Sequence, residues 1–203
     1  MIESEYETGP SLSVAFTGRD DLVRIIDEAL AHEDRASFLE RLSAALERLL
    51  RTDRIRLPSN VLAQNPDHYS RRELYRSPRF GYCIVAMVWA PGQGTPIHDH
   101  DELWCVEGIW RGVLEITPYE LLEVRDQDYR FRKAESVQIG AGETAHLAPP
   151  HEYHVVRNPS GDQVTVSIHI YQSPLARYAR FEPTEGEWFR RAQSMLEIDP
   201  SEP

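Results

Sequence analysis

The stretch Gly92-Gln-Gly-Thr-Pro-Ile-His98-Asp-His100 is the most informative part of this sequence, because it places two histidines two residues apart after a glycine–proline frame. Side chains at positions i and i+2 of an extended strand lie on the same face. The imidazoles of His98 and His100 could therefore hold one metal ion from one side, with Asp99 on the opposite face. Just upstream, Tyr82–Trp89 is an unbroken apolar run, which is typical of a buried strand.

Strand-like segments separated by glycine, proline and asparagine continue from this stretch to about residue 171. Many short strands at such spacing predict a β-barrel or jelly roll. No internal repeat, linker or low-complexity tract interrupts them. The expected strands lie near residues 82–89, 95–100, 103–109, 112–118, 121–124, 129–131, 136–139, 144–148, 153–157 and 163–171.

The chain before the barrel has a helical pattern. Residues 20–31 and 35–51 carry apolar side chains at helical spacing, and each predicts an amphipathic helix with one buried face. A third short helix is predicted near 67–76, and residues 1–18 form a loose arm. We therefore expect a single domain over residues 1–203, with a helical N-terminal layer at about 19–76, a barrel at about 80–175 and an irregular C-terminal tail.

Length, charge and cysteine content narrow the class of protein. The 203 residues suffice for one domain with a sizeable core, and the formal net charge of −11 argues against nucleic acid and anionic membrane as partners. The two cysteines, Cys83 and Cys105, imply no disulfide framework and favour a reducing compartment. No apolar stretch approaches the roughly 20 residues of a membrane span, and residues 1–10 lack an apolar signal core. We expect a cytoplasmic protein.

The residues alone leave the third ligand and the metal open. His146, His151 and His154 all follow the pair of histidines in the sequence, and each is a candidate for the third ligand. Glu102 would lie on the face of the pair if the strand continued, and would then add a carboxylate. Neutral imidazoles bind iron, zinc, copper and nickel alike, so ligand type does not separate these metals.

Two segments together resemble the metal-binding motifs of the cupin family: residues 92–112 and His154-Val-Val-Arg-Asn158. Cys105 stands where most cupins have a glutamate ligand. That exchange, together with Ser167-Ile-His169-Ile-Tyr171, resembles the thiol dioxygenases, of which cysteine dioxygenase is the best known. The resemblance covers about residues 60 to 175.

The resemblance implies a mainly β fold, a cupin-type β-barrel (jelly roll) with two or three N-terminal helices. It also implies one Fe(II) per chain, held by His98, His100 and His154. His154 is preferred as the third ligand because Asn158 completes the family's H-x-x-x-N pattern and because His154 precedes Ser167 by the family's spacing.

The same resemblance assigns roles around the metal. Tyr171 would be the catalytic phenol, with Ser167 and His169 orienting it. In animal cysteine dioxygenases a cysteine at the place of Cys105 forms a thioether with this tyrosine, and both partners are present here. The stretch from Trp104 to Gly112 instead resembles bacterial mercaptopropionate dioxygenases, which usually lack the bond, so the thioether stays open.

The family's substrates are small thiols that carry a carboxylate. Tyr69-Ser-Arg71-Arg72 fits the Tyr-x-Arg segment that binds this carboxylate in cysteine dioxygenases, and either arginine could supply two parallel hydrogen bonds. Both arginines together would suit a dicarboxylate.

The expected function is a non-haem iron thiol dioxygenase that converts a thiol carboxylate and O2 into a sulfinic acid, with cysteine as the leading substrate. The alternatives are 3-mercaptopropionate and mercaptosuccinate. A metal cupin that acts on carbon substrates, which Glu102 as a ligand would favour, and a non-catalytic small-molecule-binding cupin are the other classes. No obligate protein partner is predicted.

Overall fold

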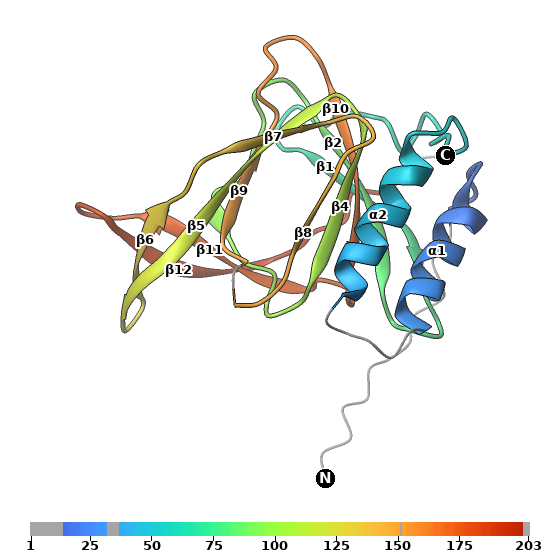
Figure 1. The fold of residues 1–203 in the computed structure, drawn as a ribbon. Coiled ribbons are helices and arrows are strands. Elements are labelled where there is room, and N and C mark those ends of the chain that lie inside the picture. Colours follow the sequence, from blue (N-terminus) through green and yellow to red (C-terminus); the bar gives the residue numbers. More distant parts are fainter. Residues whose placement is uncertain (1–13, 32–36, 151, 201–203) are drawn as a thin grey trace.

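Two antiparallel sheets form the barrel that carries most of the chain (Figure 1). The computed structural model describes residues 14–31, 37–150 and 152–200. One sheet has the order β1-β2-β10-β4-β8, and the other has the order β6-β12-β11-β3-β9-β5-β7. The elements are α1 (Arg19–Ala31), α2 (Phe38–Leu50), β1 (Ser70–Arg76), β2 (Cys83–Trp89), β3 (Ile97–His98), β4 (Cys105–Arg111), β5 (Val113–Arg125), β6 (Asp128–Lys133), β7 (Val137–Gly140), β8 (Thr144–Leu147), β9 (His154–Arg157), β10 (Thr165–Tyr171), β11 (Arg177–Pro183) and β12 (Trp188–Met195).

The apolar run of β2 is explained by burial on both of its faces. Ile84, Ala86 and Val88 pack in the core shared with the helices, whereas Val85 and Met87 face the core inside the barrel. A strand covered on both sides has no solvent face, and its sequence therefore shows no alternation. The interior core is also lined by residues of the second sheet, which closes the barrel around it.

The helices cover the outer face of the first sheet (Figure 1). Leu42, Leu46 and Leu50 of α2 are buried against it. A Cβ on Gly108 would lie 2.5 Å from a methyl of Leu50, so a residue without a side chain lets helix and strand approach closely. Among the described residues, no helix is long and apolar enough to cross a membrane.

The mainly β, cupin-type barrel with N-terminal helices is confirmed, and so are the helices predicted over 20–31 and 35–51, apart from residues 35–36, which lie outside the described residues. The predicted arm at 1–18 falls largely on residues 1–13, which also lie outside them. The segments predicted at 112–118 and 121–124 are one strand, β5.

Three expectations are wrong. The segment 67–76 is not a helix, because residues 70–76 form β1 and pair with β2. The C-terminal segment is not irregular, because β11 and β12 pair with each other and extend the second sheet. The strand expected over 95–100 is only two residues long, so His100 lies beyond the end of β3.

Candidate metal centre

Three histidines from two strands and a loop converge inside the barrel. His98 in β3 is the register partner of His154 in β9, and His100 follows β3 by two residues. One ring nitrogen from each lies within 4.8 Å of the others, and the three side chains are at most 9% exposed. The cluster therefore has the spacing of a set of ligands for one ion.

Hydrogen bonds to the backbone orient two of the three rings. Nδ1 of His98 lies 3.2 Å from the carbonyl oxygen of Pro96, and Nδ1 of His154 lies 2.6 Å from that of Glu152. The Nδ1–H of each ring would donate a hydrogen bond to its carbonyl. The lone pair of Nε2 is then free to bind a metal ion, as is common for histidine ligands. Nδ1 of His100 is buried and has no hydrogen-bond partner in the described part of the chain.

The loop that carries His100 is held by Glu152, which lies two residues before β9. The backbone N–H of His100 donates to Oε2 of Glu152 at 3.1 Å, so the ring of His100 is placed by this bond and not by strand alternation. Burial lowers the pKa of His98 to about 4 and lowers the pKa of His100 and His154 as well. All three rings are thus neutral donors at neutral pH, which fits a divalent transition metal.

The competing residues lie elsewhere. Nδ1 of His146 is 3.1 Å from the hydroxyl of Ser43 in α2, on the outer side of the sheet. Asp99 accepts hydrogen bonds from the backbone of Ala179 and Asp101. Glu102 has a φ of 64° in an exposed turn, so the strand does not continue, and its carboxylate is not part of the cluster. His151 lies outside the described residues.

The inward face of β10 presents Ser167, His169 and Tyr171. The Oγ of Ser167 lies 2.8 Å from Nε2 of His169 and accepts a hydrogen bond of 2.9 Å from the indole of Trp89. His169 meets Tyr171 by ring stacking, with the ring centroids 5.9 Å apart. The ring of Tyr171 lies edge-on to that of His100 at 5.4 Å, so the row on β10 adjoins the histidine cluster.

Both cysteines flank Tyr171. Cys105 of β4 and Cys83 of β2 are its register partners on the two sides of β10. Burial raises the pKa of Cys105 and of Tyr171, and it raises the pKa of Cys83 to about 12, so all three groups are neutral. The geometry brings Cys105 beside Tyr171, as the resemblance implies, but places a second thiol equally near in register.

The two candidate arginines point to opposite faces of β1. Arg71 donates to the hydroxyl of Tyr69 at 2.7 Å and to the carbonyl of Glu197, and its Nε is buried without a partner. Tyr69 and Met87, the register partner of Arg71, both line the cavity beside the histidines. Arg72 instead donates to the carbonyls of Val61 and Ala63, away from this cavity.

Several residues of the site were not expected from the sequence. Glu107 is buried beside His169, and it could have been found because it shares a strand face with Cys105. Tyr178 and Leu196 line the cavity. They come from the C-terminal segment for which no strand was expected, and no motif in the sequence marks them.

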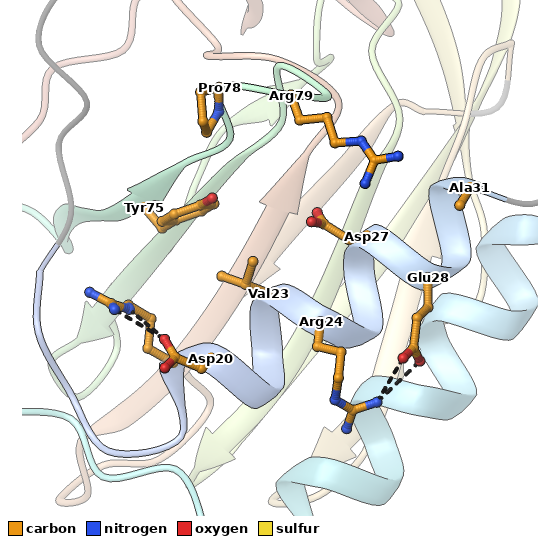
Figure 2. Close-up of a pocket in the computed structure, with 10 residues that line it drawn as sticks. Asp20, Val23, Arg24, Asp27, Glu28, Ala31, Tyr75, Pro78 and Arg79 are labelled. Carbon is orange, nitrogen blue, oxygen red and sulfur yellow. Dashed lines mark hydrogen bonds and ion pairs between the residues drawn. The ribbon is translucent and has the colours of Figure 1, made fainter.

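A second concavity lies on the outside of the molecule beside α1 (Figure 2). Two of its charged groups pair with each other, since Arg24 donates to Glu28 at 3.0 Å (Figure 2). Asp27 accepts a hydrogen bond of 2.8 Å from Tyr82. The only metal-ligand cluster among the described residues is the histidine group inside the barrel. The barrel interior is therefore the candidate site.

Comparisons with known proteins agree with this location. A family model for cysteine dioxygenase type I matches residues 63–184. Cysteine dioxygenase type 1 of Rattus norvegicus is 23% identical over 176 residues, covering 82% of this chain and 80% of that protein. The protein of the same name from Danio rerio is 25% identical over 105 residues, or 52% of each chain.

Solved structures with a similar course of the chain include the protein TT1209 from Thermus thermophilus, with a TM-score of 0.43 and 20% identity, covering 57% of this chain and 94% of that one. Another is an oxalate oxidase in complex with glycolate, with a TM-score of 0.43 and 17% identity, covering 58% of this chain and 59% of that one.

Proposed function

Because the chain belongs to the cysteine dioxygenase type I family, we propose that it is an iron-dependent thiol dioxygenase that oxidises a small thiol carboxylate with O2 to the sulfinic acid. The observation that carries the proposal is a cavity lined by three neutral imidazoles and by Tyr69, whose hydroxyl accepts a hydrogen bond from the buried guanidinium of Arg71. Bound iron would supply the redox chemistry and the open coordination positions that a thiol and O2 need.

The remaining side chains bind and orient the substrate. The guanidinium of Arg71 is buried without a carboxylate partner in the described part of the chain, so a carboxylate of the substrate would complete its pairing. Tyr69 stacks on Trp89 at 4.1 Å and holds Arg71 through its hydroxyl. Tyr171 lies beside the histidines, where its neutral hydroxyl can hydrogen-bond to substrate.

Cysteine remains the favoured substrate, with 3-mercaptopropionate and mercaptosuccinate as alternatives. A dicarboxylate would need a second cation, and the orientation of Arg72 speaks against that. The exposed turn at Glu102 removes the observation that would favour a carbon-oxidising metal cupin.

An oxygen-electrode panel tests the proposal. Iron-loaded protein is given cysteine, cysteamine, 3-mercaptopropionate and mercaptosuccinate, and we expect about one O2 consumed per thiol with a sulfinic acid as product. No O2 uptake with any thiol would favour a non-catalytic binding protein, and disulfide or peroxide as the main product would contradict the dioxygenase. Peptide mapping after turnover distinguishes a Cys105–Tyr171 thioether from two unmodified side chains.

The carboxylate role of Arg71 has its own test. Arg71→Ala should lower kcat/KM for carboxylate thiols by about tenfold or more, since a charge-assisted hydrogen bond contributes ~1.5–3 kcal/mol. Any activity on cysteamine, which has no carboxylate, should barely change. Arg76→Ala is the matched control, because Arg76 lies on the same strand and pairs with Glu73. Equal losses on both kinds of thiol would mean that Arg71 is structural.

A further inference from the structure

Glu107 is a buried carboxyl group that the proposed reaction does not use. It lies in the middle of β4, is 1% exposed, and faces the barrel interior together with Cys105 and Ile109. Its register partner on β10 is His169. Its Oε2 is 3.6 Å from Nδ1 of His169, and its Oε1 is buried without a hydrogen-bond partner among the residues that the structure describes.

Among the described residues, no arginine or lysine pairs with Glu107. The titratable groups that face it are His169 and Tyr171 from β10 and Cys105 from its own strand, while its register partner on β8 is Ala145. Burial raises the pKa of Glu107 to about 8, so the carboxyl group is neutral at pH 7. A leucine would fill the same space without the desolvation penalty of a carboxyl group, so the presence of this acid calls for a role.

His169 has a polar partner at each ring nitrogen. Nε2 lies 2.8 Å from the hydroxyl of Ser167, and Nδ1 lies 3.6 Å from Oε2 of Glu107 and 3.9 Å from Sγ of Cys105. A thiol is a weak hydrogen-bonding group, so the carboxyl group is the stronger partner of Nδ1. Burial lowers the pKa of His169 to about 3, so the ring is neutral and carries one N–H. The protonation state of Glu107 then decides which ring nitrogen carries this hydrogen. A protonated acid donates a hydrogen bond to Nδ1, whereas a carboxylate accepts one from Nδ1–H.

We propose that Glu107 is a positioning residue that sets the tautomer of His169. The protonated acid donates from Oε2 to Nδ1, and Nε2–H then donates to the hydroxyl of Ser167. When Glu107 loses its proton to solvent, His169 carries its hydrogen on Nδ1, which donates to the carboxylate. Ser167 in turn donates to Nε2, while its oxygen accepts from Trp89 in both arrangements. The ring is neutral and held at both ends in either case.

The orientation of His169 matters for the cavity. Its ring lines the site and lies parallel to Tyr171, so a ring released at Nδ1 would disturb the phenol as well. This functional part of the inference rests on the proposed thiol dioxygenase activity. The tautomer itself does not depend on it.

Nitrogen-15 NMR of the full chain in its zinc-loaded, diamagnetic form tests the tautomer directly. We expect the ring nitrogens of His169 to show Nε2–H at about pH 6 and Nδ1–H at about pH 10. Glu107→Gln has no proton to lose, and it should show one tautomer at both values. A wild-type tautomer that is the same at both values overturns the proposal even if the variant does not fold, and so does a shift that persists in Glu107→Gln.

Turnover gives the second readout. In the iron-loaded enzyme, Glu107→Leu should lower kcat by about tenfold with KM within about twofold, because Nδ1 of His169 loses its partner. Glu107→Gln, whose amide can donate to Nδ1 as the acid does, should keep kcat within about twofold at pH 7, and the ionisation near pH 8 should vanish from its pH profile. Glu115→Gln, whose carboxylate pairs with Arg157 outside the site, should leave kcat and the profile unchanged. An unaltered profile in Glu107→Gln would make Glu107 a packing residue only. If no thiol is oxidised, the NMR result still stands by itself.

Discussion

At the scale of single residues, the histidine cluster illustrates how burial and backbone contacts prepare a ligand. The carbonyl oxygens of Pro96 and Glu152 accept hydrogen bonds from the Nδ1–H groups of His98 and His154. Burial keeps both rings neutral. Each Nε2 is then available without a proton having to leave first. A metal that binds here meets donors whose orientation is already set.

Replacing one ligand should therefore empty the site. His98→Ala, His100→Ala and His154→Ala should each lose most of the bound iron, and turnover should fall by more than about 100-fold, the upper end of what removing an outer-shell partner costs. Metal analysis of the purified variants measures this. His146→Ala is the control, because its ring contacts Ser43 outside the barrel, and it should keep its iron. Retention of iron by His154→Ala would show that the ligand set is wrong.

Glu107 makes the stability of the protein depend on pH. Its pKa is raised from 4.5 to about 8, so the folded state holds a proton that the unfolded chain releases between these values. Stability is therefore lost as pH rises through this window. Glu107→Gln removes the loss, and at about pH 9 its Tm should exceed that of the wild type by at least about 2 °C, while at about pH 5 the two should agree. Calorimetry at both pH values decides, and a wild-type advantage at high pH would contradict the assignment.

The residue scale also shows what a sequence motif leaves open. Arg71 and Arg72 are chemically identical neighbours, and either fits the Tyr-x-Arg segment. Their roles separate only because β1 is a strand, which sends alternate side chains to opposite faces. The helix predicted there would have placed both on neighbouring faces, so the distinction could not be drawn before the element was known.

At the scale of elements, the sequence pattern predicts a helix or strand correctly where the element is buried on one face or on both. The prediction fails where pairing with another strand overrides the helix propensity of the residues. The apolar run of β2 and the helical stripes of α1 and α2 have an immediate packing cause. Ser70–Arg76 is rich in arginine and glutamate, which favour helices, yet pairing with β2 makes it a strand. Similarly, β11 and β12 mix charged and apolar residues because both are strands of the second sheet with partly exposed side chains.

The turn between β4 and β5 depends on Gly112. Its φ is +85°, and a Cβ there would lie 2.9 Å from the Cα of Thr165 in β10. Gly112→Ala should thus be destabilised by both strain and collision, by more than the ~1–2 kcal/mol that a left-handed conformation alone costs. Chemical denaturation measures the free energy of unfolding.

Two other glycines separate these causes. Gly92 has a φ of +76° and open space around its Cβ, so Gly92→Ala should show the strain alone. Gly161 has neither feature, and Gly161→Ala should be within about 0.5 kcal/mol of the wild type. Equal losses at Gly112 and Gly92 would mean that β10 yields to the added methyl group.

At the scale of the whole molecule, the site joins segments that lie far apart in the chain, from Tyr69 to Leu196. The histidine motifs, the Ser-x-His-x-Tyr row and the Tyr-x-Arg segment could be found from the sequence, because their spacing is local. The contribution of Leu196, Glu197 and Asp199 could not, because it arises only when the C-terminal segment packs beside β1. Nothing in the composition of that segment indicates a pocket wall.

Asp199 connects this segment to Arg71, the arginine proposed to bind the substrate carboxylate. Its carboxylate accepts hydrogen bonds from the backbone N–H of Arg71 at 2.8 Å and from the side chain of Asn65 at 3.2 Å. Burial alone would raise the pKa of Asp199, but these hydrogen bonds and His68 lower it. The group is therefore ionised at neutral pH, and its contribution to stability is lost as pH falls through its folded pKa. These bonds of Asp199 anchor the end of the C-terminal segment. They keep Leu196, three residues earlier, at the cavity, and they keep the carbonyl of Glu197, two residues earlier, at Arg71.

Loss of the anchor should weaken substrate binding without disturbing the metal. Asp199→Ala removes hydrogen bonds of about 0.5–1.5 kcal/mol each, so kcat/KM for a thiol carboxylate should fall by roughly threefold to tenfold, mainly through KM. Iron content should be unchanged, since the histidines lie on other elements. Glu182→Ala is the control, because its carboxylate pairs with Arg180 at the surface of β11. Asp199→Asn keeps an oxygen that can accept from Arg71 and should recover part of the loss. A fall in kcat at constant KM, or a loss of iron, would show that the C-terminal segment acts on the metal centre and not on the arginine.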